Sequence, residues 1–421
     1  MNAGAKSEAS ESAGQCPAGR EKLPGSVIPP ETGNCTLPSP LEYFGAMLDH
    51  CYEYAEAAKG QGRTIVGIMC EFTPRELILA AGGVPVCLCG GSAATIAAAE
   101  QYLPANLCPL IKSTYGFLVK GTNPFLNWAD LVVAETTCDG KKKMFELMGE
   151  TKPMYVLELP QKSDDADALE HWVLEIRKFK EHLEARFRTV ISDEKLVEAI
   201  QLMNRERRLR RELADLMTAR PPPLTGRQLL AFRSIISGIE TDLSQYGRAL
   251  EWFAEPEQQA RMENRKSDVR VLLTGVPLVN GAERVVELIE SSGAVVVCME
   301  NCTGLKPILE DVDLSESDPV RAIAQKYYHL PCSVMTSNQA RLRSLRDLAA
   351  KFRPDCVIEL VWQACLTYDV ESYRVRRLVE EELRLPYLKL TTDYSPADSQ
   401  RISARVEALF ETVRARRGES G

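Results

Sequence analysis

The pattern of apolar and polar positions alternates between two periods along the chain. Short apolar runs rich in β-branched residues are typical of buried strands. Between them lie longer segments with apolar residues three or four positions apart, which is the spacing of an amphipathic helix. Strands and helices in alternation predict an α/β fold with parallel sheets. The predicted strands span residues 64–69, 84–88, 130–134, 154–159, 269–274, 294–298, 356–361 and 387–391.

The first predicted strand leads into a compact strand–helix–strand unit. Thr73 offers the hydroxyl of a helix N-cap, Pro74 suits the first helical position, and Glu76 stands where a capping box needs its carboxylate. Gly82–Gly83 ends this short helix before the next apolar run. Cys70 lies at the carboxyl end of the first strand, where open α/β sheets place their ligands. Its thiol is therefore a candidate metal ligand.

The chain divides into four predicted parts. Residues 1–38, rich in Gly, Ser, Glu and Pro, are expected to be a disordered tail. Residues 39–162 form a first α/β domain, preceded by a helix that starts at the capping signal Ser39/Glu42 and runs to about Lys59. Residues 163–266 are helical throughout, and residues 267–421 form a second α/β domain. The helices expected in the helical segment are Asp164–Phe187, Ser192–Thr218 and Gly226–Phe253, and those of the second domain span 281–291, 318–328, 339–352, 369–383 and 399–416.

The charge balance limits the classes of partner. The formal net charge is -8 at pH 7, which argues against nucleic acid as the main partner. No apolar run reaches the roughly 18 residues that a membrane span needs, so we expect no membrane association. The tail has no apolar signal-peptide core. We therefore predict a cytoplasmic protein.

The chain is rich in cysteine, with 13 residues of this type. Stable disulfides are disfavoured in the cytoplasm, and a zinc site is disfavoured because there is no Cys-x-x-Cys pair and there are only 4 histidines. Single cysteines at strand ends instead fit an iron–sulfur cluster that the fold assembles. Six of them lie beyond a strand end or in a polar loop flanked by Pro or Gly, namely Cys70, Cys108, Cys138, Cys302, Cys332 and Cys365.

The number six bears on the type of cluster. A single 4Fe-4S cubane takes four thiolates, so six suit two linked cubanes with three protein thiolates each, or one cubane with spectators. Cys298 could replace Cys302, and Cys356 could replace Cys365, if the loops lie differently. The cysteines within or beside apolar strand runs are expected to be small core residues, namely Cys87, Cys89, Cys298 and Cys356.

Charged residues beside these cysteines are candidates for catalysis. Glu71 and Glu135 could shuttle protons, and Lys112 could donate to the cluster or to substrate. A surface carboxylate or simple helix capping explains each of them equally well. Lys141–Lys143 opens a helix, where positive charge is unfavourable. This triplet could stabilise an anionic cluster, dock an acidic partner, or form a solvated helix face.

Three segments carry a resemblance to a known family: CEFTPRE at 70–76, LPANLCPLIKS at 103–113 and ETTCDGKKKM at 135–144. Over about residues 40–415 the chain resembles the 2-hydroxyacyl-CoA dehydratase and benzoyl-CoA reductase superfamily. Within it, the chain is most similar to the branch of double-cubane cluster proteins, which are anaerobic reductases. We therefore predict two Rossmann-like parallel-sheet domains that face each other across a cleft, with the helical segment between them and the six sulfurs converging on that cleft.

The resemblance also implies a cofactor and partners. It implies an 8Fe-9S cluster, two cubanes joined by a bridging sulfide, held by the six cysteines. It further implies a homodimer that receives electrons from a separate ATP-hydrolysing iron–sulfur reductase. The sequence itself has no Gly-x4-Gly-Lys-Ser/Thr loop to cradle phosphates.

The predicted function is ATP-dependent, low-potential reduction of a small molecule. The alternative is a subunit of a 2-hydroxyacyl-CoA dehydratase or benzoyl-CoA reductase-type enzyme with a single 4Fe-4S cluster on three cysteines. An electron carrier or cluster-storage protein is a third class. The sequence does not name the substrate.

Overall fold

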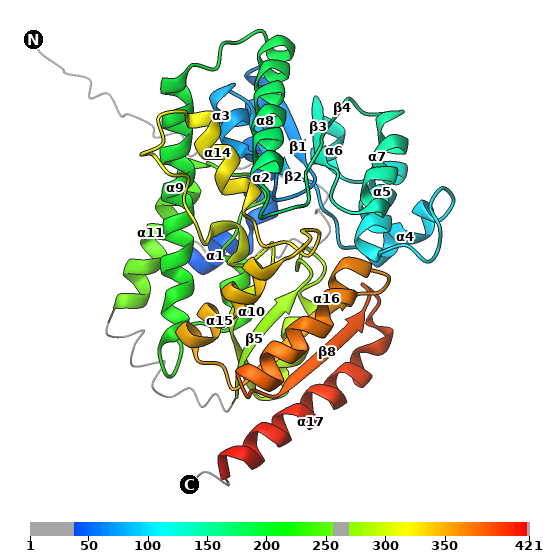
Figure 1. Cartoon of the computed structure of the whole chain (residues 1–421), viewed down its shortest axis with the longest axis vertical. Coiled ribbons are helices and arrows are strands. Elements are labelled where there is room, and N and C mark those ends of the chain that lie inside the picture. The colour runs from blue at the N-terminus through cyan, green and yellow to red at the C-terminus, as the bar shows by residue number, and fades with distance from the viewer. Residues whose placement is uncertain (1–37, 256–268, 419–421) are drawn as a thin grey trace, which may run out of the picture.

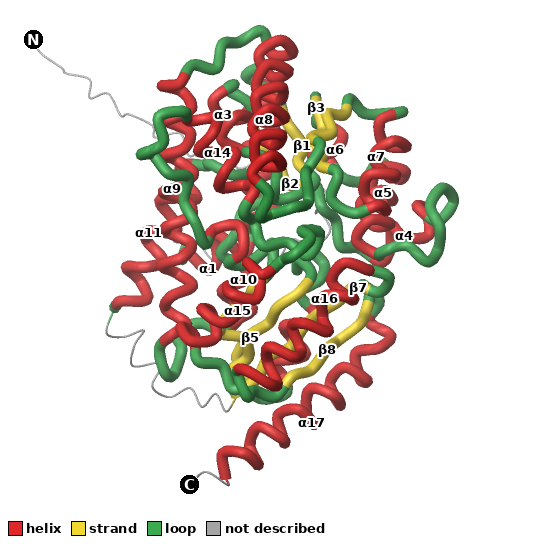
Figure 2. Tube along the Cα trace, viewed as in Figure 1, coloured by secondary structure: helices red, strands yellow, loops and turns green. Residues whose placement is uncertain are grey.

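The computed structural model describes residues 38–255 and 269–418. In this part of the chain, the strands form two parallel sheets of four strands each. Figure 1 shows the two sheets one above the other, with the helices of the middle segment along one side. In Figure 2 the strands lie inside and the helices around them. The predicted α/β class, with two parallel-sheet domains of Rossmann-like type, is confirmed.

The first sheet has the strand order β2-β1-β3-β4 and the second has the order β6-β5-β7-β8. Both sheets therefore share one topology, in which the strand order reverses beside the first strand. Open α/β sheets bind ligands beyond the carboxyl ends of the strands at such a point. The strands are β1 (Ile65–Ile68), β2 (Val84–Cys87), β3 (Leu131–Glu135), β4 (Met154–Leu157), β5 (Val269–Gly275), β6 (Ala294–Glu300), β7 (Cys356–Trp362) and β8 (Tyr387–Thr392).

The helices of the first domain follow the predicted pattern with two differences. The expected first helix is broken at Ala46 into two pieces, although the capping box of Ser39 and Glu42 is present. The predicted capping box of Thr73 and Glu76 is wrong, because Pro74 is the N-cap and makes no side-chain cap bond. The helices are α1 (Pro40–Gly45), α2 (Met47–Gly60), α3 (Arg75–Ala80), α4 (Ala93–Ala99), α5 (Pro109–Lys120), α6 (Pro124–Trp128) and α7 (Asp139–Gly149).

The helical segment between the sheets contains one larger surprise. The helix predicted over Gly226–Phe253 is two helices, because residues 232–239 leave the helical path to run beside β2. There Ile236 pairs with Val86 in an antiparallel bridge, and the Cys87 amide donates to the Ile235 carbonyl at 2.7 Å. The helices are α8 (Ala166–Phe187), α9 (Asp193–Asp215) with the 3₁₀ turn η1 (Leu216–Thr218), α10 (Gly226–Ala231) and α11 (Glu240–Ala254).

The helices of the second domain lie close to their predicted positions. The main difference is that the helix predicted from residue 369 begins at Leu366, directly after Cys365, and passes into a π-helical turn. No helix in residues 38–255 or 269–418 is long and apolar enough to cross a membrane. The helices are α13 (Arg284–Ser291), α14 (Pro319–Tyr328), α15 (Gln339–Phe352), α16 (Leu366–Arg377) and α17 (Ser399–Gly418), with short turns at η2 (Lys306–Ile308), η3 (Leu378–Glu382) and η4 (Pro396–Asp398).

The predicted domain boundaries remain predictions. Residues 1–37 of the predicted tail and residues 256–268 at the end of the helical segment lie outside the described residues. Cys16 and Cys35 therefore also lie outside them.

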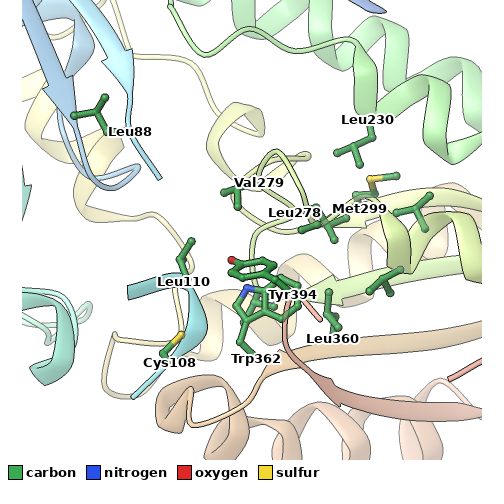
Figure 3. Close-up of a cluster of buried hydrophobic side chains, with 14 of the residues drawn as sticks. Leu88, Cys108, Leu110, Leu230, Leu278, Val279, Met299, Leu360, Trp362 and Tyr394 are labelled. Carbon is green, nitrogen blue, oxygen red and sulfur yellow. The ribbon is translucent and has the colours of Figure 1, made fainter. Parts of the chain in front are cut away.

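The two domains share a hydrophobic core. One continuous group of buried side chains contains Leu88 and Leu110 of the first domain together with Leu278 and Trp362 of the second. Figure 3 shows these residues with Tyr394, whose ring lies against Trp362 at a centroid distance of 4.7 Å. Burial of apolar area contributes roughly 25 cal/mol per Å². The shared core therefore fixes the positions of the domains relative to each other.

A close backbone contact joins the domains at the edge of this core. Gly281 has φ +96, and a Cβ atom there would lie 2.0 Å from the carbonyl oxygen of Gly91. A Cβ on Gly91 would in turn lie 2.6 Å from the carbonyl oxygen of Asn280. Neither backbone can yield easily, because each belongs to a packed loop of the opposite domain. Only glycine fits at both positions.

We expect Gly281→Ala to destabilise the protein by about 2 kcal/mol or more, through positive φ and the clash with Gly91. Chemical denaturation measures this change. Gly60→Ala is the control, because Gly60 ends α2 with nothing within 4 Å of an added Cβ. A Gly281→Ala protein as stable as the parent would contradict the close-contact account.

Candidate metal centre

The six predicted cysteines lie at the ends of strands and helices that meet between the domains. Cys70 follows β1, Cys138 follows β3, Cys302 follows β6, and Cys365 follows β7. Cys108 is the N-cap of α5, and Cys332 lies in the loop between α14 and α15. Four of them thus stand beyond the carboxyl ends of strands from both sheets.

Three of these thiols, which we call the loop triad, lie in loops: Cys70, Cys302 and Cys332. The charges of Cys302 and Cys332 each act on the Cys70 thiol, and that of Cys332 acts on Cys302. Burial raises the pKa of Cys70 well above its ordinary value and that of Cys302 to about 12. The loop triad therefore brings thiols from both domains together, away from water.

The other three thiols, which we call the cap triad, are N-caps of helices: Cys108 of α5, Cys138 of α7 and Cys365 of α16. Cys365 donates to the Cys108 sulfur, which lowers the pKa of Cys108 and raises that of Cys365. The Cys138 thiol is close enough to be influenced by both Cys365 and Cys332. Cys332 therefore links the two triads.

Helix N-termini favour negative charge on the sulfurs of the cap triad. Unpaired backbone N–H groups and the helix dipole both stabilise an anion at this end of a helix. The N–H groups of Leu110 and Ile111 lower the pKa of Cys108, and that of Lys141 opposes the rise that burial causes at Cys138. The cap triad is thus suited to hold sulfur as thiolate.

The lysine triplet of α7 divides between the inside and the surface. Lys141 Nζ donates to the Met69 carbonyl at 2.7 Å, one residue before Cys70. Burial alone would lower the pKa of Lys141, but the charges of Cys70, Cys89 and Cys138 outweigh it and raise the pKa. Lys142 and Lys143 point outward into ion pairs with Asp139 and Glu146 of their own helix. Lys141 therefore lies among the thiols, and only its two neighbours are exposed.

Glu135 is a buried carboxyl at the end of β3. Thr73 Oγ1 donates to its Oε1, which explains why Thr73 does not cap α3, and Oε2 has no partner among the described residues. Burial raises the pKa of Glu135 to about 8, against the opposing effects of Thr73 and Lys141. Glu71 instead forms an ion pair with Arg75 at 2.8 Å. Of the two predicted carboxylates, Glu135 is the one with a free oxygen in the interior.

Lys112 has contacts that direct it elsewhere. Its Nζ lies 2.7 Å from Glu100 Oε1 and 2.7 Å from the Ala105 carbonyl, in the loop before Cys108. An ammonium bound in this way holds that loop in place. The structure thus gives the Lys112 side chain a structural contact, while the Lys112 backbone N–H donates to the Cys108 carbonyl at 3.1 Å.

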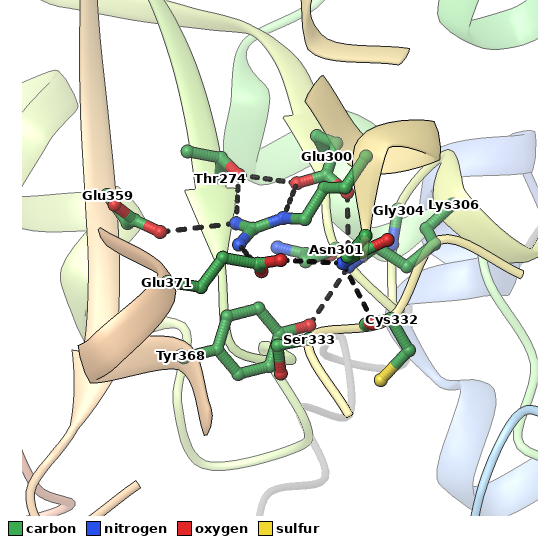
Figure 4. Close-up of polar contacts among 12 residues, drawn as sticks. Thr274, Glu300, Asn301, Gly304, Lys306, Cys332, Ser333, Glu359, Tyr368 and Glu371 are labelled. Atoms are coloured by element: carbon green, nitrogen blue, oxygen red, sulfur yellow. Dashed lines mark hydrogen bonds and ion pairs between the residues drawn. The ribbon is translucent and has the colours of Figure 1, made fainter. Parts of the chain in front are cut away.

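A buried charge network that the sequence did not reveal supports the cysteines of the second domain. Arg341 of α15 is completely buried and forms ion pairs with Glu300, Glu359 and Glu371 at 3.3, 3.2 and 2.5 Å. Thr274 donates to Glu300 and accepts from Arg341. Figure 4 shows this network, with Glu359 on the side away from Cys332.

This network reaches both second-domain members of the loop triad. Lys306 Nζ lies 3.0 Å from Glu300 Oε1 and 2.9 Å from Tyr368 Oη, and its charge opposes the raised pKa of Cys302. Asn338 Nδ2 bridges the Cys332 carbonyl and Glu371 at 2.9 and 2.8 Å. One signal of the network was visible in the sequence, because Glu359 interrupts an apolar strand run and Glu300 ends another. Arg341 lies on an Arg-rich helix, and its sequence neighbours give no sign of its burial.

The four cysteines expected in the core fall into two pairs. Cys298 in β6 and Cys356 in β7 are completely buried, and no predicted ligand cysteine acts on either thiol. Cys87 and Cys89 are only partly buried and contact each other, and the Cys70 charge acts on Cys89. Cys89 Sγ donates to the Met69 carbonyl at 3.1 Å. Cys89 therefore lies at the edge of the group formed by the six predicted ligand cysteines. The apolar residues around it in the sequence had predicted a position in the core.

Buried donors without partners also gather at the thiols. Thr137 Oγ1 and Asn301 Nδ2, each one residue before a predicted ligand, have no hydrogen-bond partner in the described residues. The same holds for Trp362 Nε1 and Tyr394 Oη, and the charges of Cys108 and Cys365 act on Tyr394. Buried polar groups are normally satisfied, so these donors indicate a missing acceptor. The sulfides of an iron–sulfur cluster fit that description, as the six thiols fit its irons.

Within residues 38–255 and 269–418, no three His, Cys, Asp or Glu side chains lie close enough to hold a single metal ion. A cubane does not need such a group, because four cysteines ligate its four irons, one to each. The thiols of one cubane therefore lie around the whole cluster and do not need to meet at a single point.

Comparison with known proteins identifies the family. Residues 70–413, which include all six cysteines and every strand except β1, match the family described as 2-hydroxyglutaryl-CoA dehydratase, D-component. The chain belongs to this family. YjiM of Escherichia coli (strain K12), named as a candidate dehydratase subunit, is 40% identical over 90% of this chain and 98% of its own length. The predicted superfamily is therefore confirmed.

Two more distant members extend the comparison. The β subunit of lactoyl-CoA dehydratase from Anaerotignum propionicum is 23% identical over 84% of this chain and 92% of its own. A benzoyl-CoA reductase subunit from Thauera aromatica is 20% identical over 63% of this chain and 68% of its own. These two relatives are thus named as subunits of a dehydratase and of a reductase.

Arg341→Ala tests the charge network. We expect it to destabilise the protein by about 3–5 kcal/mol, because Glu359 and Glu371 lose their cation and Glu300 keeps only Lys306. Arg346→Ala is the matched control on the same helix, since Arg346 forms only an exposed pair with Glu382 and should have little effect. Denaturant unfolding measures both. Equal stability of the two variants would contradict the role of Arg341.

Proposed function

We propose that the chain is an iron–sulfur reductase that carries a double-cubane 8Fe-9S cluster and reduces small molecules at low potential. One observation carries the proposal: six thiols from both domains gather where the carboxyl ends of the two sheets meet. Such a cluster supplies electrons at a potential that the surrounding charges and hydrogen bonds set. The resemblance to the double-cubane branch supports the type of cluster. The positions of the six cysteines support them as its ligands.

Two sets of residues support cluster binding in the proposal. The loop triad and the cap triad each provide three thiolates, and each triad combines both domains. Lys141 and Lys306 offset the negative charge that collects there, together with the N-termini of α5, α7 and α16. Thr137, Asn301, Trp362 and Tyr394 provide donors for sulfides. We therefore propose that one triad holds each cubane.

Glu135 is the proposed proton donor. Its carboxyl is mostly protonated at pH 7 because burial raises its pKa to about 8, and its free Oε2 lies beside the thiol region. A donor of this kind can give a proton to a reduced substrate and recover it from water. Neither Glu71 nor Lys112 is retained in this role, because each is engaged in an ion pair.

A dehydratase subunit with one 4Fe-4S cluster on three cysteines is the second candidate. The names of the relatives favour it. Six gathered thiols favour the double cubane, since a single cubane would leave several buried thiols without a use. The homodimer and the separate ATP-hydrolysing reductase remain predictions from the resemblance, and the substrate is a small molecule.

The pairing of triads with cubanes can be tested by combining substitutions. We expect Cys70→Ser or Cys108→Ser alone to remove about half of the iron, because each disables one cubane. Adding Cys302→Ser to Cys70→Ser should cost little more, whereas Cys70→Ser with Cys108→Ser should remove nearly all iron. Iron and acid-labile sulfide are measured after anaerobic purification.

Cys356→Ala is the control for this series and should keep its iron, because Cys356 lies inside β7. Equal losses from the two double variants would contradict the assignment of triads to cubanes. About four irons in the unmodified protein would favour the dehydratase reading.

Lys141→Met tests charge compensation against docking. A cation beside the thiols favours the reduced, more negative cluster, so its removal should shift the midpoint potential to a more negative value. Lys142→Met is the matched control, since Lys142 is exposed and paired with Asp139. A redox titration followed by electron paramagnetic resonance measures both. The same potential in both variants would contradict the inward role of Lys141.

A further inference from the structure

A cavity of about 390 Å³ lies on the outer side of the Cys302 and Cys332 loops. Its wall is formed by the end of α9, the turn η2, the end of α14 and one face of α15. Lys306 and Pro331 belong to this wall, and Pro331 directly precedes Cys332. The volume falls within the range of small-molecule sites in proteins. Neither the family comparison nor the thiol site assigns a role to this cavity.

Lys326 of α14 is a buried lysine in the cavity wall. The residue is 7% exposed, and its Nζ donates to the Pro307 carbonyl at 2.9 Å and lies 4.3 Å from the centre of the Tyr327 ring. Among the described residues, no carboxylate forms an ion pair with it. Buried charges are normally paired with an opposite charge.

The two carboxylates whose charges act on Lys326 are paired with other cations. Glu76 forms an ion pair with Arg207, and Glu71 forms one with Arg75 at 2.8 Å. With Lys326 protonated the group would hold three cations and two anions, an imbalance that disfavours the proton on Lys326. Burial, followed by the charge of Arg207, lowers the pKa of Lys326 well below its ordinary value. An anion placed in the cavity would relieve this imbalance.

A second cation faces the same cavity without a partner. Arg343 of α15 lines it, is exposed, and forms no ion pair in the described part of the chain. The other cations of the wall are engaged: Lys306 with Glu300, Arg211 with Asp311, and Lys351 with Asp215. Glu310 and Asp347 also belong to the wall and, like Arg343, are exposed to water, where the charges of all three are screened.

We propose that this cavity binds a small oxyanion, a carboxylate or a phosphate, between Lys326 and Arg343. The amine of Lys326 takes up a proton when the anion binds and then supplies a buried point charge, and the guanidinium of Arg343 supplies paired donors that match two oxygens. The proposed site goes beyond the reductase function and does not depend on the cluster type. A bound anion would lie behind the wall that Lys306 shares with the thiol region.

Calorimetric titration of the anaerobically purified protein with inorganic phosphate, and separately with lactate, tests the proposal. Ionic strength is held constant with sodium chloride so that diffuse charge effects are screened. We expect at least one of the two to bind with a dissociation constant of about 1 mM or below. Binding of phosphate alone identifies a phosphate site, and binding of lactate alone identifies a carboxylate site.

The variants locate the binding. Lys326→Met and Arg343→Ala should each weaken it tenfold or more, and Arg346→Ala, on the same helix but outside the cavity wall, should not. Arg343 is exposed, so its removal leaves the core intact even if Lys326→Met unfolds the protein. Absence of binding by both anions at about 10 mM, or binding that survives Arg343→Ala unchanged, would overturn the proposal.

Discussion

The burial of negative groups between the two domains is the constraint on which the rest of the structure depends. Six thiols and several carboxyls gather there, and each ionised group out of water carries a large desolvation cost unless a cation or N–H group faces it. The chain meets this requirement with buried cations from neighbouring helices and turns: Lys141, Lys306 and Arg341. It adds the N-termini of three helices, each capped by a cysteine. The shared hydrophobic core holds these parts in register.

The two domains meet the constraint in parallel ways. In the first, Thr73 donates to Glu135 at the end of β3, with the charge of Lys141 acting on that carboxyl. In the second, Thr274 donates to Glu300 at the end of β6, which pairs with Lys306. The difference lies in the neutralisation, since Arg341 draws three carboxylates into one network, whereas Glu135 keeps a free oxygen and a raised pKa. That asymmetry suits a structural role for one carboxyl and a chemical role for the other.

The sequence predicted the sheets well because a buried strand depends on a local run of apolar residues, and all eight such runs became strands. The sequence-based predictions were wrong where contacts between residues far apart in the sequence determine the local conformation. Residues 232–239 leave the helix to bond β2, and Thr73 gives up its cap to bond Glu135. Likewise, the triplet Lys141–Lys143 gave no sign of which lysine turns inward, and Arg341 looked like its exposed neighbours. Such outcomes depend on partners up to 148 positions away, as between Cys87 and Ile235.

The central claim is that thiols from both domains together hold an iron–sulfur cluster. Iron X-ray absorption of the anaerobically purified, unmodified protein tests it most directly, because its extended fine structure reports the atoms around each iron. The account predicts iron with sulfur neighbours and short iron–iron distances, together with about eight irons per chain. Iron bound by oxygen and nitrogen, or a protein that holds zinc in place of iron, would contradict it.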